Sequence, residues 1–468
     1  MDDRHDDLDT WLNGRVDPLY PPPGTFDLIR RRARRLKYRK LAVTAGSAAV
    51  IVAAAITVPQ VVNFTTVNAP VTGALAGRAS VSPRTGPGIP ESAGATQPAF
   101  PSPSAAPLLP VPADFRPSSV TFVGTDTGWV IGQAGTPGQC ATEFCTSVAR
   151  TDNAGDSWTG VPAPLTGAAD GASGVSQIRF LNLDDGWAFG PELWATHDGG
   201  QTWTQVDTHG QRVTDLETVG DWVFALFATC TGDGAAFASG CTSFTLYSSP
   251  AWTDDWNPVG AATSGLTAAA PGGGYGSASL FLTETRGYLL APDGTLYAGR
   301  VNVVAATPAW QAVGHIPCAG AVGQAQADGQ PAGALIGAED AQHLILACTP
   351  HPVPGFGLQK KYIYASADGG AGWHMIAVAP TTGVATSVAA SKVEGVILAT
   401  DQGIDVLPAG GTTWQALTLT GPPPGGFSYV GMTTAQQGVA LPAEPQAGTV
   451  WFTFDGGQTW APSTVSGS

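Results

Sequence analysis

The octapeptide THDGGQTW at residues 196–203 occurs in related form three more times in the chain. The shared form is Ser/Thr-x-Asp/Asn-x-Gly-x-Ser/Thr/Gly-Trp, and the other copies are TDNAGDSW at 151–158, SADGGAGW at 366–373 and TFDGGQTW at 453–460. Three weaker copies keep mainly the tryptophan, at Trp256, Trp310 and Trp414. Successive tryptophans of the seven copies are 45, 53, 54, 63, 41 and 46 residues apart. A period of about 40–50 residues is typical of one four-stranded blade of a β-propeller.

A second repeated element has the same phase. About 30 residues before each tryptophan, two apolar runs flank a polar or glycine turn, as in VTFVGTDTGWVIG from Val120 and IRFLNLDDGWAFG from Ile178. Each element has the pattern of a hairpin formed by the first two strands of a blade. The 61 glycines and 38 prolines agree with many short strands and turns. We therefore predict an all-β, seven-bladed β-propeller in a domain of residues 118–468, with the blades at about 118–466.

Each position of the octapeptide has a role in folding. An Asp or Asn side chain such as that of Asp198 can accept hydrogen bonds from backbone N–H groups of its own turn. A following glycine such as Gly200 adopts positive φ without steric cost, and Trp203 can bury its ring between blades. The alternative interpretation, in which the carboxylates act as acid/base pairs or calcium ligands, is not needed to explain these residues. The residues with this structural role are Asn153, Gly155, Trp158, Asp198, Gly200, Trp203, Asp368, Gly370, Trp373, Asp455, Gly457 and Trp460.

The octapeptide resembles the Asp-box, or BNR, repeat of sialidases, sortilin-type receptors and photosystem II assembly factor-like propellers, and the resemblance covers nearly 350 residues. It implies that the boxes lie between the third and fourth strands of each blade, away from the ligand face. Loops between second and third strands, and between blades, would then line the opposite rim, where ligands usually bind to a rigid scaffold. The candidate binding residues on these loops are Phe144, Asp233, Phe237, His351, Phe356, Lys360 and Lys361.

Six cysteines also fall in these loops or beside them. An even number confined to one part of the chain indicates disulfides formed in an oxidising compartment. The pairing Cys140–Cys145, Cys230–Cys241 and Cys318–Cys348 would brace three loops of one rim, either for binding or simply to protect hairpins from proteolysis. There is no CxxC pair and the seven histidines are scattered, so we expect no structural metal.

The N-terminal part of the chain has a different composition. Residues 41–62 are uncharged and mostly apolar, and about 20 such residues span a bilayer as a helix. Eight Lys/Arg residues lie between residues 30 and 40 and none follows the span closely, which predicts a cytoplasmic N-terminus and an extracytoplasmic propeller. A cleaved signal peptide is the alternative, but 40 residues precede the apolar run.

The segments on either side of the predicted anchor complete the domain organisation. Residues 1–40 form a basic cytoplasmic tail, which would lie on anionic lipid or dock a cytoplasmic regulator. The tail followed by an Ala/Val anchor resembles the N-terminal anchor segments of actinobacterial membrane proteins. Residues 63–117 are rich in Pro, Ala and Ser and predict an extended linker.

Charge and motifs restrict the function. Residues 41–468 hold 11 basic and 29 acidic residues, a net charge of −18, so nucleic acid is not an expected partner. We predict a non-catalytic binding or assembly scaffold with a protein or glycan ligand and no cofactor. A sialidase-type glycosidase is one alternative, although only Arg150, Arg179, Arg212, Arg286 and Arg300 lie in the blades and the Phe/Tyr-Arg-Ile-Pro segment of that family is missing. A transmembrane sensor is the other.

Overall fold

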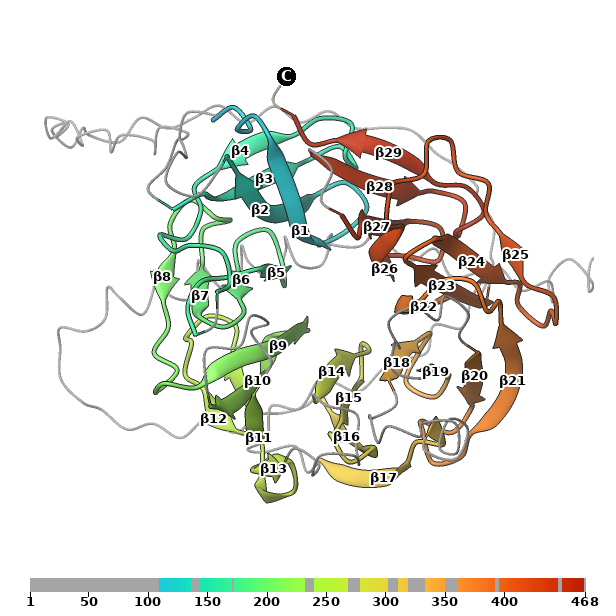
Figure 1. The fold of residues 1–468 in the computed structure, drawn as a ribbon. Coiled ribbons are helices and arrows are strands. Elements are labelled where there is room, and N and C mark those ends of the chain that lie inside the picture. Colours follow the sequence, from blue (N-terminus) through green and yellow to red (C-terminus); the bar gives the residue numbers. More distant parts are fainter. Residues whose placement is uncertain are drawn as a thin grey trace, which may run out of the picture. The chain divides into compact units, whose positions relative to one another are not determined.

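The computed structural model describes residues 109–135, 144–170, 172–231, 240–267, 278–301, 310–318, 333–349, 360–391, 395–444 and 448–466. They form seven antiparallel sheets, each built from consecutive strands (Figure 1). This arrangement confirms the predicted all-β, seven-bladed β-propeller.

The blades have the following strands. Blade 1 holds β1 (Phe115–Phe122), β2 (Gly128–Ala134), β3 (Thr146–Thr151) and β4 (Thr159–Val161). Blade 2 holds β5 (Gln177–Phe180), β6 (Gly186–Phe189), β7 (Leu193–Thr196) and β8 (Thr204–Gln205). Blade 3 holds β9 (Arg212–Val219), β10 (Trp222–Cys230), β11 (Cys241–Pro250), β12 (Asn257–Pro258) and the additional β13 (Leu266–Thr267), with a 3-10 turn, η1, at Ala261–Thr263. Blade 4 holds β14 (Ser279–Leu282), β15 (Arg286–Leu290), β16 (Thr295–Arg300) and β17 (Gln311–His315).

The remaining blades repeat the pattern. Blade 5 holds β18 (Gly333–Ala338), β19 (Leu344–Thr349), β20 (Lys361–Ser366) and β21 (His374–Ala379). Blade 6 holds β22 (Ala385–Ser391), β23 (Gly395–Thr400), β24 (Gly403–Leu407) and β25 (Gln415–Ala416). Blade 7 holds β26 (Phe427–Met432), β27 (Gly438–Pro442), β28 (Thr449–Thr453) and β29 (Ala461–Thr464).

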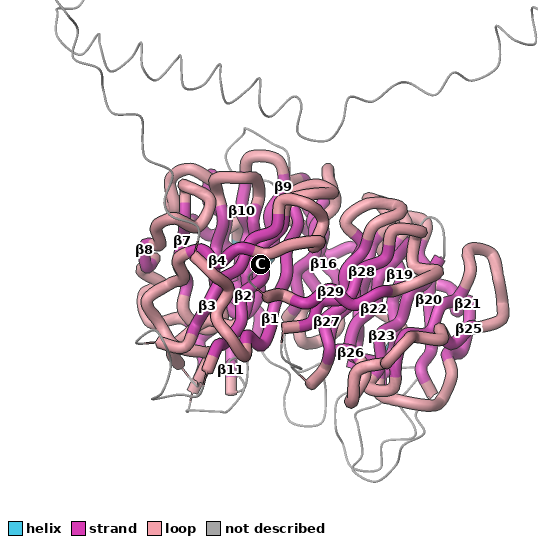
Figure 2. The backbone as a smooth tube through the Cα atoms, turned by 90° about the horizontal axis from the view of Figure 1, so that it is seen from above, coloured by secondary structure: helices cyan, strands magenta, loops and turns pink. Residues whose placement is uncertain are grey.

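The first strand of every blade lies nearest the ring axis and the fourth lies at the circumference (Figure 1). When the ring is seen edge-on, the strands run from one of its faces toward the other (Figure 2). Because the strands are antiparallel, the turns after first and third strands lie on one rim. Loops after second strands and between blades lie on the opposite rim. We call the first the box rim, because the octapeptide turns follow third strands, and we call the second the loop rim.

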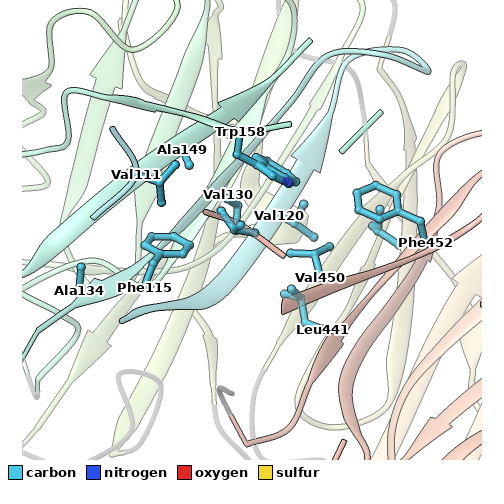
Figure 3. Close-up of a cluster of buried hydrophobic side chains, with 12 residues drawn as sticks. Val111, Phe115, Val120, Val130, Ala134, Ala149, Trp158, Leu441, Val450 and Phe452 are labelled. Carbon is cyan, nitrogen blue, oxygen red and sulfur yellow. The ribbon is translucent and has the colours of Figure 1, made fainter. Parts of the chain in front are cut away.

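Side chains close the ring between blades 1 and 7, because no strand is shared between them. Phe115, Val120 and Trp158 of blade 1 pack with Val450 and Phe452 of blade 7 in one buried cluster (Figure 3). Burial of such apolar surface stabilises the closure by roughly 25 cal/mol per Å². The hydrophobic cores of the protein are thus the seams between neighbouring blades.

The N-terminal boundary of the propeller can be compared with the predicted linker. Strand β1 begins at Phe115, and Leu109 forms an antiparallel bridge to Gly160 of β4. Both Phe115 and Leu109 belong to the segment predicted as linker, residues 63–117. The predicted tail (1–40) and anchor (41–62) lie outside the described residues, and within the described ones no helix is long and apolar enough to span a bilayer.

Candidate functional site

The four complete octapeptides form the predicted turns between third and fourth strands. In blade 2, Thr196 Oγ1 donates to Asp198 Oδ1 (2.9 Å) and accepts from the N–H of Gly200 (2.9 Å), while the N–H of Thr202 donates to Asp198 Oδ1 (2.9 Å). Burial opposes ionisation of Asp198, but hydrogen bonds from Thr202 and Thr196 outweigh it and lower the pKa of this carboxyl. Gly200 has φ of +91°, which explains the glycine.

The other complete copies have the same bonds. The N–H groups of Gly155, Gly370 and Gly457 are bound by the hydroxyl four residues earlier, at 2.8–2.9 Å. Asn153 and Asp455 also accept a bond from the N–H of the residue four positions later, at 2.9–3.0 Å. Asp368 accepts from the N–H of Gly372 at 2.9 Å in the same way. The Asp and Asn side chains of the four copies therefore accept hydrogen bonds from the backbone of their own turns and stabilise them.

The seven box tryptophans pack into successive seams between blades, as predicted. Trp203 of blade 2 lies against blade 1 and donates its Nε1–H to the carbonyl of Pro162 (2.9 Å). Trp158 contacts blade 7 in the closing seam, and Trp460 contacts blade 6. Trp373 packs against blade 4. The repeated motif thus stabilises both a turn and a seam.

The predicted disulfides lie at the loop rim. Cys230 and Cys241 are bonded at the junction of β10 and β11, and Cys318 is bonded to Cys348 at the end of β19. Cys145 is disulfide-bonded as well, and its predicted partner Cys140 lies outside the described residues. The two bonds with both cysteines described have the predicted pairing.

Most of the predicted binding-face residues are not described: Asp233, Phe237, His351 and Phe356 lie outside the described residues. Phe144 is half-buried just before β3, and Lys360 is exposed just before β20. The structure therefore does not bring the predicted set together, and the binding face on the loop rim stays a prediction.

The prediction that Lys361 is a binding residue is wrong. It was predicted on a binding loop, but it is the first residue of β20 and is fully buried. Its Nζ donates to the carbonyls of Thr382 (2.9 Å) and Gly383 (2.8 Å) in the connection between blades 5 and 6. Burial lowers the pKa of Lys361, and the nearby Asp405 and Asp401 oppose this effect. Lys361 thus links strand β20 to the connection between blades 5 and 6, and its buried side chain is not available to a ligand.

A pocket of about 460 Å³ lies at the box rim between blades 5 and 6. Blade 5 contributes Ile345, Ala365 and Ile376, and blade 6 contributes Leu407 and Ala409. The size falls in the range of small-molecule sites, roughly 300–1,000 Å³, and the walls are mainly apolar, as such sites usually are. This pocket is a described concave site with the size and the apolar lining that ligand sites usually have.

Three titratable side chains line the same pocket: Glu339, His343 and His374, all of them exposed. The Nδ1 atom of His343 lies 2.9 Å from Asp340 Oδ2, which orients the imidazole. Hydrogen bonds from His343 outweigh burial and lower the pKa of Asp340 to about 2, so this carboxylate is charged at neutral pH. The pocket therefore combines an apolar interior with a polar, partly anionic mouth.

The missing box of blade 6 explains the apolar wall. In the alignment with THDGGQTW, Leu407 stands where Thr196 stands in blade 2, and Ala409 stands in place of Asp198. The turn therefore has alkyl side chains at the two positions where the complete boxes have a hydroxyl and a carboxylate or amide. The sequence pattern predicted binding at the loop rim and not at this pocket, although the degenerate turn of blade 6 is a signal of the pocket in the sequence.

A second polar cluster lies on the inner strands. Arg179 Nε of β5 lies 3.2 Å from Glu217 Oε1 of β9. Burial opposes the charge, but Glu217, Tyr429 and Asp215 outweigh it and raise the pKa of Arg179. Burial and the charge of Glu217 raise the pKa of Asp215 to about 7, while Asp215 Oδ2 accepts the N–H of Leu280 at 2.7 Å. These contacts link blades 2, 3 and 4, and the charged groups of the cluster bind one another and the backbone of Leu280.

His197 joins blades 2 and 3 on the box rim. Its Nδ1 lies 3.0 Å from Asp185 Oδ1 and its Nε2 lies 2.9 Å from Asp254 Oδ2. Hydrogen bonds to these two carboxylates raise the pKa of His197 to about 10, although burial opposes the shift. Trp187 donates its Nε1–H to Asp254 at 2.9 Å, which holds that carboxylate in place. In the described part of the chain, no group of three or more His, Cys, Asp or Glu residues is arranged to hold a metal ion.

Comparison with known proteins identifies no family. No protein-family model matches the chain, and no curated protein matches it. Among solved structures, YCF48 bound to D1 peptide is similar, with 15% identity, a TM-score of 0.47 and coverage of 76% of this chain and 99% of that one. YCF48 from Cyanidioschyzon merolae has 14% identity, a TM-score of 0.46 and coverage of 74% and 98%. The extracellular domain of the putative one component system BT4673 from B. thetaiotaomicron has 10% identity, a TM-score of 0.43 and coverage of 76% and 40%. At these values the similarities carry no argument about function, and the propeller assignment rests on the strand pairing.

Proposed function

We propose that this chain is a non-catalytic binding scaffold, anchored to a membrane by residues 41–62 and displaying its propeller outside the cell. The pocket between blades 5 and 6 is the observation that carries the binding function. It is built on two sheets of a closed ring, and a rigid scaffold lowers the entropic cost of binding.

The topology part of the proposal rests on the sequence. An uncharged span follows a cluster of basic residues, which favours a cytoplasmic N-terminus. The disulfides of the propeller agree with an oxidising compartment outside the cytoplasm.

The contacts of the arginines favour binding over glycoside hydrolysis. A sialidase-type site needs three arginines free to hold the substrate carboxylate. Arg150 is paired with Asp152 at 2.6 Å, and Arg179 is paired with Glu217. The guanidinium of Arg286 lies over the ring of Tyr288, 5.4 Å from its centroid. Each of these three arginines is engaged at a separate position in the ring.

The test is capture of partners by the tagged full chain from membranes of the source organism after chemical crosslinking. We expect defined membrane or extracytoplasmic proteins or glycans that a control chain of residues 1–113 does not capture. In parallel, the purified chain is incubated with fluorogenic sialosides and related glycosides. Release of fluorophore, or the same captured set for both chains, would refute the proposed function.

A further inference from the structure

The outer strand of blade 5 is unusual among the seven fourth strands of the ring. β21 (His374–Ala379) has 6 residues, whereas the others have between 2 and 5. Its sequence, HMIAVA, has no proline and no Asp, Glu, Lys or Arg. In the described part of the chain no strand pairs with its outer edge. Soluble proteins usually shorten, charge or cover such an edge, because its unpaired N–H and C=O groups attract another extended chain.

Side chains on β21 also favour a partner. Met375 is 55% exposed and Val378 is 44% exposed, and both belong to the small set of large exposed apolar residues in the described chain. His374 and Ile376 of the same strand line the pocket between blades 5 and 6. The free edge, the exposed apolar side chains and the pocket therefore adjoin one another.

Blade 1 shows that an outer edge of this ring accepts an extended segment. Leu109 lies antiparallel to Gly160 of the outer strand β4, and the N–H of Gly160 donates to the carbonyl of Leu109 at 2.7 Å. At blade 1 the chain itself covers the edge. At blade 5 no described segment does so, although β21 is twice as long as β4 (6 against 3 residues).

The acidic residues near the pocket indicate that the partner segment has basic side chains. Glu339 lines the pocket, and Asp340 beside it holds His343 through a 2.9 Å contact. The chain from residue 41 onward has a net charge of −18. An incoming segment with basic side chains next to an apolar one would meet these carboxylates at the mouth and the alkyl wall of Leu407 and Ala409 inside.

We propose that blade 5 binds an extended peptide segment of a partner protein, which adds to the free edge of β21 and inserts an apolar side chain, flanked by basic residues, into the pocket between blades 5 and 6. Side chains of an added strand alternate between two faces, so those on one face enter the pocket while those on the other pack near Met375. This inference rests on the proposed function as a binding scaffold and names the class of partner.

The probe is a fluorescein-labelled peptide, Thr-Arg-Val-Leu-Val-Arg-Thr, which places leucine and both arginines on one face. Its binding to the purified full chain is measured by fluorescence anisotropy. Replacing the central leucine by aspartate is expected to weaken binding about tenfold or more, because the apolar anchor is lost. N-methylation of alternate backbone amides is also expected to weaken binding about tenfold, because it removes strand-to-strand hydrogen bonds without changing any side chain.

Two variants and a control locate the site. Ala409→Trp fills the pocket, and Met375→Lys places a charge beside the edge; each is expected to weaken binding by about tenfold. Phe454→Lys changes another exposed apolar residue, on blade 7, and should leave binding unchanged. Melting temperatures of all three variants verify that the ring is intact.

Several results would overturn the inference. They are absence of binding by the wild type, equal binding of the N-methylated peptide, or equal binding by Ala409→Trp. A concentration-dependent dimer in sedimentation that Met375→Lys abolishes would also overturn it, because a second copy would then occupy the edge. If partner capture by the full chain persists in any of these cases, the scaffold function stands and only the peptide site is refuted.

Discussion

Replacing Phe452 by alanine tests how much apolar packing stabilises the closure between blades 1 and 7, where hydrogen bonds such as Gln437 Nε2 to the carbonyl of Thr125 (2.7 Å) also cross the seam. Phe452 is 3% exposed and packs edge-on against Phe122 of β1, with ring centroids 5.6 Å apart. It also lies against Gly155, where an added Cβ would come within 2.6 Å of Phe452 Cζ. A phenylalanine truncated in such a core costs roughly 3–5 kcal/mol, because apolar contacts are lost and a cavity is left.

The expected loss can be converted into a melting temperature. For a propeller of about 350 residues, an unfolding entropy near 2.1 cal/mol/K per residue gives about 0.7 kcal/mol/K. The loss then corresponds to a decrease of about 4–7 °C, measured by differential scanning calorimetry of the purified chain.

Phe454→Ala is the matched control. Phe454 is 59% exposed and only stacks on Phe452 from outside, 6.0 Å between centroids. Its removal should change stability by less than about 1 kcal/mol, or about 1 °C. Equal effects of the two substitutions, or a decrease of less than about 1 °C for Phe452→Ala, would refute the packing argument.

Three further predictions address polar and covalent contacts. The pKa of His197 is raised to about 10 in the folded state, so its contribution to stability is complete below its ordinary pKa and is lost as pH rises toward 10. Because its side chain is 40% exposed, we expect only about 1 kcal/mol, seen as a pH-dependent difference in urea unfolding between wild type and His197→Gln that vanishes above about pH 10. The Cys318–Cys348 bond closes a loop of sequence separation 30, so the double alanine variant should lose about 3–4 kcal/mol by chemical denaturation; an unchanged midpoint would contradict this. Lys361→Met leaves the buried carbonyl of Gly383 and the partly buried carbonyl of Thr382 without their donor and should cost about 2–3 kcal/mol, whereas Lys360→Met next to it should cost less than about 0.5 kcal/mol; equal costs would contradict the burial of Lys361.

The box turns could be predicted because their interactions are local. All the bonds of Asp198 join residues within four positions in the sequence, from Thr196 to Thr202. The regular spacing of seven tryptophans then indicates the number of blades. The disulfide pairing Cys230–Cys241 followed from the same register, because both cysteines flank one loop between a second and a third strand.

Lys361 could not be placed in this way. Its position beside Lys360 in a polar stretch resembled a binding loop, but its Nζ binds carbonyls of Thr382 and Gly383, more than twenty residues away. Whether a lysine at the start of a strand points to solvent or into a seam depends on how two blades pack. The sequence pattern of one blade does not contain that information.

For the pocket too, one part could be predicted from the sequence and another part depends on how the blades pack. The degenerate turn was visible in the sequence, since Ala409 stands in place of the box aspartate. That the turn faces Ile345 and Ile376 of blade 5 results from the packing of two sheets, and β21 beside it lacks an outer partner among the described residues because it is the last strand of its sheet. Because local hydrogen bonding and periodicity act along the chain, the sequence by itself determined the box turns and the seven blades. Because seams are made by residues far apart in the chain, only the tertiary structure decided where Lys361 is buried and where the ring leaves a pocket.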